Sequence, residues 1–248
     1  MPNIYLSPST QEYNNYITGN TEEFYMNRLA DAMEPYLRAA GIRFTRNRPD
    51  MTAAASIRES NAGDYDLHLA LHSNAAPESL SGQLRGPDIY YYPGSLRGQR
   101  AAAIIANNLR NIYPEPALVE LRDTTYLGEV SKTRAPSVLI EIAYHDNLQD
   151  ANWITGNIQK IARTIVLALT EYFDLPFVEP ASGSRYGKVV TDQQRLNIRN
   201  RPGMAGEIIG SVPNGEVVSV YGVEPSGWMS IGYNGIIGYS DGSYIEML

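Results

Sequence analysis

The sequence predicts an α/β domain, with a mostly parallel sheet flanked by helices, followed by a small all-β barrel. Apolar strands alternate with helical segments across the first 173 residues, an order typical of α/β layers. This pattern ends at DLPFVEPASGSRYG, where prolines and small residues indicate a linker. Beyond it, short β-branched and aromatic runs are separated by Gly and Pro, as in small barrels. We therefore expect domains at residues 1–175 and 186–248, joined by a linker at 176–185.

The elements of the first domain follow from its apolar pattern. Apolar runs predict strands at 4–6, 42–45, 67–72, 89–92 and 138–144. Apolar residues at helical spacing between 26 and 40 predict a first helix, which Pro35 should kink or divide. Further helices are expected at 101–113 and 152–173. In the second domain, the expected strands lie in GKVVT, LNIRNRPG, GEVVSVYG, GWMSIGY and GIIGYS.

Composition excludes several classes of function. The chain is 43% hydrophobic and 19% charged, as expected of a globular protein, and no apolar run approaches the roughly 20 residues of a membrane span. MPNIYLSP lacks the pattern of a secretory signal. With no cysteine, any metal must be held by His, Asp, Glu or a neutral oxygen. A net charge of −7 without a Lys/Arg run argues against nucleic acid as a partner.

One histidine lies where a strand is expected to leave the sheet. Strand alternation places His68, Ala70 and His72 of DLHLALHSNAA on one face, and His72 ends the strand. His72 either caps the strand or serves a site at its carboxyl end. His68 is a poor partner for the same metal, because four strand residues correspond to roughly 13 Å, whereas zinc–nitrogen bonds are about 2 Å.

Two carboxylates are further candidates. Asn20 and Glu23 of NTEEFYMN fit a helix capping box, so Glu23 either satisfies backbone N–H groups or is a rigidly held metal ligand. Glu141 interrupts the apolar strand of APSVLIEIAYHDN and there requires a charge partner, a metal or a raised pKa. No local partner for an ion pair is visible. A general base facing a metal-bound water is therefore favoured for Glu141.

Taken together, these segments resemble the zinc-dependent N-acetylmuramoyl-L-alanine amidases of the amidase-3 family. The resemblance is carried by IYLSP, EEFYMNRLADAMEPYLRAAG, FTRNRPD, DLHLALHSNAA, DIYYYP and RAPSVLIEIAYHDN. It implies a Zn²⁺ cofactor held by Glu23 and His72, and Glu141 as the base. It also implies that Asn74, in the H-x-N motif, contacts the substrate.

The opening loop departs from this family. Where the family usually reads D-P-G-H-G-G, this chain has SPSTQE, so the usual first zinc-binding histidine aligns with Thr10. The amide of Gln11, the carboxylate of Glu12 or the imidazole of His145 could replace it, or the site could bind metal poorly. We expect Gln11 to take this place because its position in the loop is nearest. His145 is expected to contact substrate or to orient Glu141.

The second domain resembles bacterial SH3 (SH3b) modules through LNIRNRPG, GEVVSVYG and GWMSIGYNGIIGYS. This resemblance implies binding to cell-wall peptide or glycan. Aromatic side chains here either form a stacking surface or belong to the barrel core, so no ligand residue is assigned. The residues concerned are Tyr221, Trp228, Tyr233, Tyr239 and Tyr244.

The predicted function is hydrolysis of peptidoglycan at the amide between the MurNAc lactyl group and L-alanine. The resemblance implies that Zn²⁺ polarises the carbonyl and activates a water, while the SH3b domain tethers the enzyme to the polymer. A non-catalytic cell-wall-binding protein and a hydrolase of another peptide bond in the wall are the alternatives. We expect a monomer that acts outside the cell at the bacterial wall, either an endolysin released through a holin or a mature fragment of a secreted autolysin.

Overall fold

The computed structural model describes residues 1–182 and 185–248, and these fall into two compact units. The first unit comprises residues 3–33 and 44–172, and the second comprises residues 1–2, 34–43 and 173–248. Residues 183–184 of the predicted linker lie outside the described residues. Among the described residues, no helix has the length and apolar character needed to cross a membrane.

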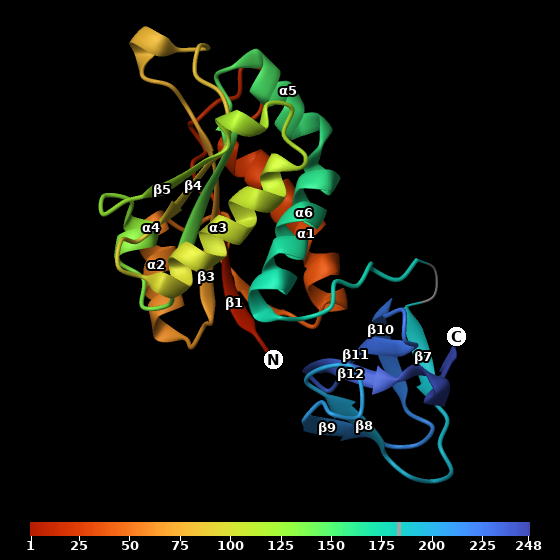
Figure 1. Cartoon of the computed structure of the whole chain (residues 1–248). Coiled ribbons are helices and arrows are strands. Elements are labelled where there is room, and N and C mark those ends of the chain that lie inside the picture. Colours follow the sequence, from red (N-terminus) through yellow and green to blue (C-terminus); the bar gives the residue numbers. More distant parts are fainter. Residues whose placement is uncertain (183–184) are drawn as a thin grey trace. The chain divides into compact units, whose positions relative to one another are not determined.

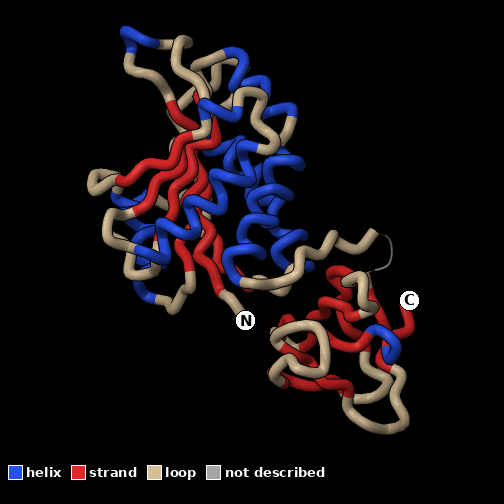
Figure 2. Tube along the Cα trace, in the orientation of Figure 1, coloured by secondary structure: helices blue, strands red, loops and turns tan. Residues whose placement is uncertain are grey.

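Within the described residues, the first unit contains one sheet with the strand order β2-β1-β3-β6-β4-β5. Its strands are β1 (Asn3–Pro8), β2 (Arg43–Arg46), β3 (Leu67–Asn74), β4 (Asp88–Tyr91), β5 (Glu120–Asp123) and β6 (Ser137–Tyr144). Strands β1, β3 and β6 are parallel, whereas β4 is antiparallel to β6 and parallel to β5. Figure 2 shows these strands gathered between helices. The predicted α/β class is therefore confirmed, with a mixed sheet.

Helices cover both faces of this sheet (Figure 1). They are α1 (Glu22–Ala39), α2 (Ala53–Ala62), α3 (Leu96–Arg110), α4 (Gly128–Ser131), α5 (Leu148–Gly156) and α6 (Ile158–Phe173). Helices α2 and α4 lie on one face, and α1, α3 and α6 lie on the other. Val130 of α4 packs on Ala70 of β3 and Leu139 of β6. The face that carries His68, Ala70 and His72 therefore lies against α2 and α4.

Three helical features differ from the sequence prediction. The segment predicted as one helix at 152–173 is two helices, because Asn157 ends α5: its N–H donates to the carbonyl of Ile154 and its side chain to that of Trp153. Pro35 does not divide α1, which runs unbroken to Ala39. Helix α2 was not predicted, because its buried positions are the polar Ser56 and Ser60 rather than an apolar stripe.

The second unit contains the predicted all-β barrel. Its strands are β7 (Tyr186–Val189), β8 (Leu196–Arg199), β9 (Ile208–Val212), β10 (Val217–Val223), β11 (Trp228–Tyr233), β12 (Ile236–Asp241) and β13 (Ile245–Met247). Their order is β13-β7-β10-β11-β12-β8-β9, and the pairings are antiparallel. Their inward side chains form one apolar core of Val189, Leu196, Ile198, Val212, Val218, Val220, Ile231 and Ile245.

A buried carboxylate on α5 fixes the end of β6. Asp150 is fully buried, and its Oδ1 accepts a hydrogen bond from the Tyr113 hydroxyl at 2.6 Å. Its Oδ2 accepts from the backbone N–H groups of Gly86 at 2.9 Å and Tyr144 at 3.1 Å. This one side chain therefore ties the exit of β6 to the loop that enters β4.

Replacing this carboxylate should destabilise the fold. Asp150→Ala leaves one hydroxyl and two backbone N–H groups without their buried acceptor, and we expect a loss of about 3 kcal/mol in the free energy of unfolding. Urea denaturation measures this loss. Asp50→Ala, which removes an exposed partner of Arg48, is the control and should change stability little. Equal stability of both variants would contradict this role of Asp150.

Candidate functional site

Strand register brings three ionisable side chains together. His72 of β3 pairs with Glu141 of β6, and Glu141 pairs with Asp88 of β4. Directly paired residues of adjacent strands point to the same face of a sheet. On β1, Ser7 pairs with Ala70 and so also faces this way. The sheet thus presents an imidazole and two carboxyl groups side by side at the end of β3.

The first turn of α1 brings another carboxylate to His72. Thr21 caps the helix, since its Oγ1 accepts a hydrogen bond from the N–H of Phe24 at 3.2 Å. Asn20, the expected cap, instead has a left-handed backbone with φ of 62°. As a result Glu22 points to His72, at 2.8 Å between Glu22 Oε1 and His72 Nδ1. The Glu23 side chain turns away and accepts from Asn27 Nδ2 at 3.0 Å.

The imidazole of His72 lies between two carboxylates. Its Nδ1 faces Glu22, and its Nε2 lies 3.0 Å from Oε2 of Glu129 on α4. Burial by itself lowers the pKa of His72, but hydrogen bonds to Glu129 and Glu22 outweigh burial and hold this pKa well above its ordinary value. The pKa of Glu129 falls to about 2, because its bonds to His68 and His72 outweigh the opposing effect of burial. The ring is therefore a cation held by two anions.

The pKa of Glu141 is shifted in the opposite direction to that of Glu129. Its Oε2 is buried and has no hydrogen-bond partner among the described residues. Burial raises the pKa of Glu141 to about 7, with the charges of Glu22, Asp88 and Glu129 adding to the effect and His72 opposing it. A carboxyl group in this position gains and loses a proton near neutral pH, which is the property required of a general base.

The opening loop brings Gln11 to the same place. Gln11 Nε2 lies 3.4 Å from His72 Nδ1, and the side chain of Asn14 donates to both Gln11 Oε1 at 2.8 Å and Glu22 Oε2 at 2.7 Å. The carbonyl of Gln11 also accepts from the N–H of Glu23 at the start of α1. These hydrogen bonds hold the opening loop against the start of α1 and place Gln11 beside the His72–Glu22 pair.

Asn74 and His145 lie beside this cluster. Asn74 Nδ2 donates to Asp88 Oδ2 at 3.4 Å. His145 is buried, donates from Nδ1 to the carbonyl of Ser73 at 2.8 Å and stacks on Tyr16 with ring centroids 5.2 Å apart. Within the described residues, the structure gives neither side chain a hydrogen bond to His72 or Glu141.

Sequence reasoning missed Glu22, Glu129 and Asp88. The sequence contained a signal for Glu22, because Thr21 is also a residue that can cap a helix. With Thr21 as the cap, the carboxylate that contacts His72 is Glu22 rather than Glu23. No local signal could have found Glu129, because α4 is a single turn of four residues and Glu129 meets His72 only through the fold.

The cluster offers two donors of the kind that Zn²⁺ accepts, namely an imidazole nitrogen of His72 and a carboxylate oxygen of Glu22. Gln11 turns its Nε2 toward His72 and its Oε1 toward Asn14, so rotation of the amide by half a turn would be needed to bring its oxygen to this place. No group of three His, Cys, Asp or Glu side chains within residues 1–182 and 185–248 is arranged to hold a metal. The unpartnered Oε2 of Glu141 lies in the same buried region, which is consistent with a cation or a proton being required there.

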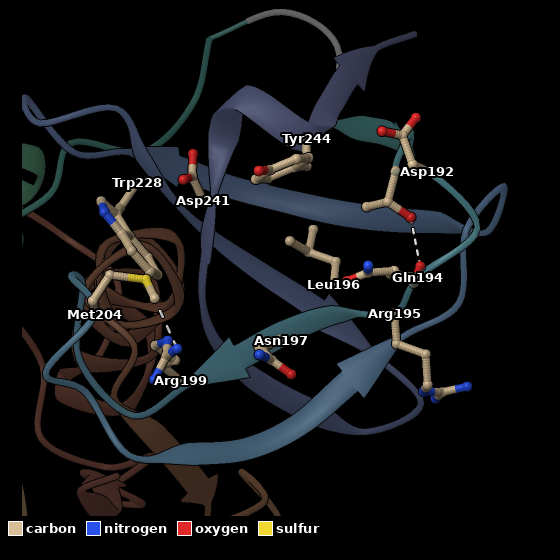
Figure 3. A pocket seen from close by; sticks show the side chains of 11 residues that line it. Asp192, Gln194, Arg195, Leu196, Asn197, Arg199, Met204, Trp228, Asp241 and Tyr244 are labelled. Atoms are coloured by element: carbon tan, nitrogen blue, oxygen red, sulfur yellow. Dashed lines mark hydrogen bonds between the residues drawn. The ribbon is translucent and has the colours of Figure 1, made fainter.

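The barrel carries a separate pocket of about 410 Å³. Figure 3 shows Trp228 at one side, Asp241 and Tyr244 along its rim and Asn197 below. Tyr244 is exposed, whereas Tyr239 is fully buried and cannot stack on a ligand. Of the five aromatic residues singled out in the sequence, Trp228 and Tyr244 are therefore the ones that line this pocket.

A family model described as N-acetylmuramoyl-L-alanine amidase matches residues 9–171, which is well over half of the chain. The chain belongs to this amidase family. A second model, described as a bacterial SH3 domain, matches residues 194–246. The amidase match includes all the residues of the cluster around His72, and the SH3 match contains most of the barrel.

Solved amidase structures have the same fold as the first unit. The N-acetylmuramoyl-L-alanine amidase AmiC2 of Nostoc punctiforme is 14% identical, with a TM-score of 0.61 over 70% of this chain and 97% of that one. CwlV from Bacillus (Paenibacillus) polymyxa var. colistinus is 15% identical, with a TM-score of 0.59 over 71% and 100%. The catalytic domain of the CD27L endolysin targeting Clostridia difficile is 20% identical, with a TM-score of 0.57 over 69% and 98%. A search of curated protein sequences finds no significant match.

The raised pKa of Glu141 predicts a pH-dependent stability of the metal-free protein. Its carboxyl titrates at about 7 in the fold against an ordinary value of 4.5, so the folded state holds an extra proton between these values. This group therefore lowers the free energy of unfolding as the pH rises through that range. Glu141→Gln should abolish this contribution and stabilise the chelator-treated protein by about 3 kcal/mol at pH 8.

Urea denaturation at pH 5 and pH 8 measures the effect. The control is Glu12→Gln, which changes an exposed carboxylate of the opening loop and should leave the pH dependence as it is. A Glu141→Gln variant with the same pH dependence as the unchanged protein would contradict the interpretation.

Proposed function

We propose that this amidase-family chain is a zinc-dependent peptidoglycan hydrolase that cleaves the amide between the MurNAc lactyl group and L-alanine. The observation that carries the proposal is the pairing of Glu141 with His72 across adjacent strands. It sets an unpartnered carboxyl group beside a His–Glu pair of metal-binding type. Membership of the amidase family supports the choice of bond.

In this proposal His72 and Glu22 hold the metal, with the amide of Gln11 as a third, neutral ligand. His72 contributes Nδ1, the nitrogen that faces both Glu22 and Gln11. Zn²⁺ supplies a Lewis acid that polarises the scissile carbonyl. Glu22 takes the ligand role that the sequence pattern assigned to Glu23, because Glu22 is the carboxylate that contacts His72.

Glu141 moves the proton in this mechanism. Its carboxylate accepts a proton from the attacking water as the new carbon–oxygen bond forms. It then donates that proton to the L-alanine nitrogen as the carbon–nitrogen bond breaks, so the amine leaves neutral. Asn74 donates a hydrogen bond to Asp88, and His145 donates one to the carbonyl of Ser73, so both lie beside this site. We assign them to the binding of the substrate.

The barrel anchors the enzyme to its polymer. A bacterial SH3 module together with an amidase domain supports peptidoglycan as the common partner of both units. The aromatic side chains of Trp228 and Tyr244 offer faces on which a glycan ring or a peptide can stack. Tethering to an insoluble substrate raises the effective concentration of the catalytic unit at the bacterial cell wall.

A wall-binding protein without hydrolytic activity is the second candidate. Thr10 stands where the family usually has a histidine, and no third ionisable ligand joins His72 and Glu22 within the described residues. If Gln11 does not complete the site, the scaffold keeps its affinity for the wall and loses the metal. Zinc content and the release of amines separate the two functions.

Substitutions of the adjacent residues Glu22 and Glu23 provide the first test of the proposed metal site. Glu22→Gln should lower zinc affinity by at least about 100-fold, because it removes a charged ligand, whereas Glu23→Gln should keep one zinc per chain. Zinc stoichiometry by elemental analysis and zinc affinity by calorimetry are measured together with the release of L-alanine amino termini from peptidoglycan. Glu23→Gln is a matched control, since the two residues are adjacent in α1.

The results distinguish three cases. Loss of zinc and of amine release in Glu22→Gln alone supports the proposed site. Loss in Glu23→Gln alone would return the ligand role to Glu23. No zinc and no amine release in the unchanged protein, even with zinc added, would overturn the enzyme and leave the wall-binding protein.

Glu141→Gln tests the proton transfer separately from the metal. The variant should retain zinc, because Glu141 is not a proposed ligand, and should lose about 10²- to 10⁴-fold in kcat, as removal of a general base does. A Glu141→Gln variant with the activity of the unchanged protein would exclude Glu141 as the base.

A further inference from the structure

We propose that Glu129 is a positioning residue for the metal site. Its carboxylate fixes the proton of His72 on Nε2, so that Nδ1 faces Glu22 and Gln11 as the ligand nitrogen. This inference rests on the proposed function, because it concerns the nitrogen that would bind zinc. Nothing in the sequence around Glu129 indicates it, and it follows from contacts between distant segments.

Glu129 lies in a position that leaves it little freedom. It is 6% exposed and belongs to α4, which lies against the sheet face that carries His72. The next residue, Val130, is 2% exposed and packs on Ala70 and Leu139. Packing on both β3 and β6 therefore holds the backbone of α4, and with it the carboxylate of Glu129, at a set distance from His72.

Three donors converge on this carboxylate. Oε1 accepts from the hydroxyl of Ser7 and from Nε2 of His68, the latter at 3.2 Å. Oε2 accepts from Nε2 of His72 at 3.0 Å. The two histidines are four residues apart on β3, yet both rings reach one carboxylate. Glu129 is thus the point where β1, α4 and two positions of β3 are joined.

The far side of His68 is held by contacts with α2 and β1. Nδ1 of His68 lies 2.9 Å from the hydroxyl of Ser60 on α2, and its ring stacks on Tyr5 with centroids 5.3 Å apart. Because the ionised carboxylate of Glu129 can only accept, the Nε2–H of His68 donates to it. Each oxygen of Glu129 therefore needs to accept, which a carboxylate does on both oxygens and an amide does on only one.

This arrangement has a consequence for the metal. A neutral imidazole has one N–H and one lone pair, and the hydrogen bond made by one nitrogen decides which atom is free to bind a metal. In the metal-free cation both ring nitrogens carry a proton. Once Nδ1 gives up its proton, the hydrogen bond from Nε2–H to Glu129 keeps the remaining proton on Nε2 and leaves the lone pair on Nδ1. Without an acceptor at Nε2, the proton is free to occupy Nδ1, where it blocks the nitrogen that Glu22 and Gln11 face.

The test is Glu129→Gln, with Ser60→Ala as the matched control. Both variants remove one group from the same buried cluster, but Ser60 contacts His68 and not His72. The chain has three histidines, so ¹⁵N-histidine labelling of the full chain gives assignable ring signals. The first readout is the Nε2–H proton of His72 in the metal-free protein, and the second is zinc affinity by calorimetry.

In the unchanged protein we expect a downfield, slowly exchanging Nε2–H signal of His72. Glu129→Gln should shift this signal and speed its exchange, and should weaken zinc binding by about 10- to 100-fold, as removal of an outer partner of a metal ligand does. Ser60→Ala should leave both readouts unchanged. If Glu129→Gln does not fold, Glu129→Asp, which withdraws the carboxylate by one methylene, should show the same loss.

Two results would overturn the inference: an unchanged His72 Nε2–H signal in Glu129→Gln, or equal effects of Glu129→Gln and Ser60→Ala on both readouts. Failure of the proposed function is recognised separately. If the unchanged protein binds no zinc, the zinc-dependent hydrolase fails, and the metal-free signal of His72 still decides whether Glu129 positions this ring.

Discussion

The site depends on one imbalance: three glutamates lie close to a single imidazole that has only two nitrogens. His72 provides a hydrogen bond to Glu22 through one nitrogen and to Glu129 through the other, so both of these carboxylates are ionised. Glu141 receives no hydrogen bond in the described structure and keeps its proton up to a pH of about 7. Two kinds of carboxyl group thus lie close together: two that are ionised by their hydrogen bonds to the His72 cation, and one that burial holds near its titration point despite that cation.

Three parts of the fold, namely the sheet, α1 and α4, bring these charged side chains together. Strand register places His72 beside Glu141, while the first turn of α1 and the single turn of α4 each supply one carboxylate. Asp150 fixes the exit of β6, and the opening loop is fastened to α1 through Asn14. The arrangement of these side chains is therefore a property of the whole α/β unit, and each contributing segment is held by its own contacts.

The sequence singled out the candidate residues that strands carry, and it gave no sign of the contacts that depend on the helix frame or on tertiary structure. The period of β3 identified His72, and the apolar run of β6 made Glu141 conspicuous. Glu23 was chosen as a ligand from its position in the family resemblance, and a shift of one residue moves a carboxylate to another face of a helix. The contact between Glu129 and His72 could not be predicted, because a helix of a single turn leaves no periodic pattern in the sequence. The strand order and the division between α5 and α6 at Asn157 likewise required the structure.

The amide in the opening loop bears on which metals the site accepts. If Gln11 completes it, the protein ligands are one nitrogen and two oxygens, in place of a set with two imidazoles. Affinity for divalent metals follows ligand type and geometry as well as the general order of the metals, and oxygen donors are suited to manganese. An oxygen-rich set of this kind discriminates less sharply between zinc, cobalt and manganese. The metal found in the protein would then reflect the supply in its surroundings as much as the preference of the site.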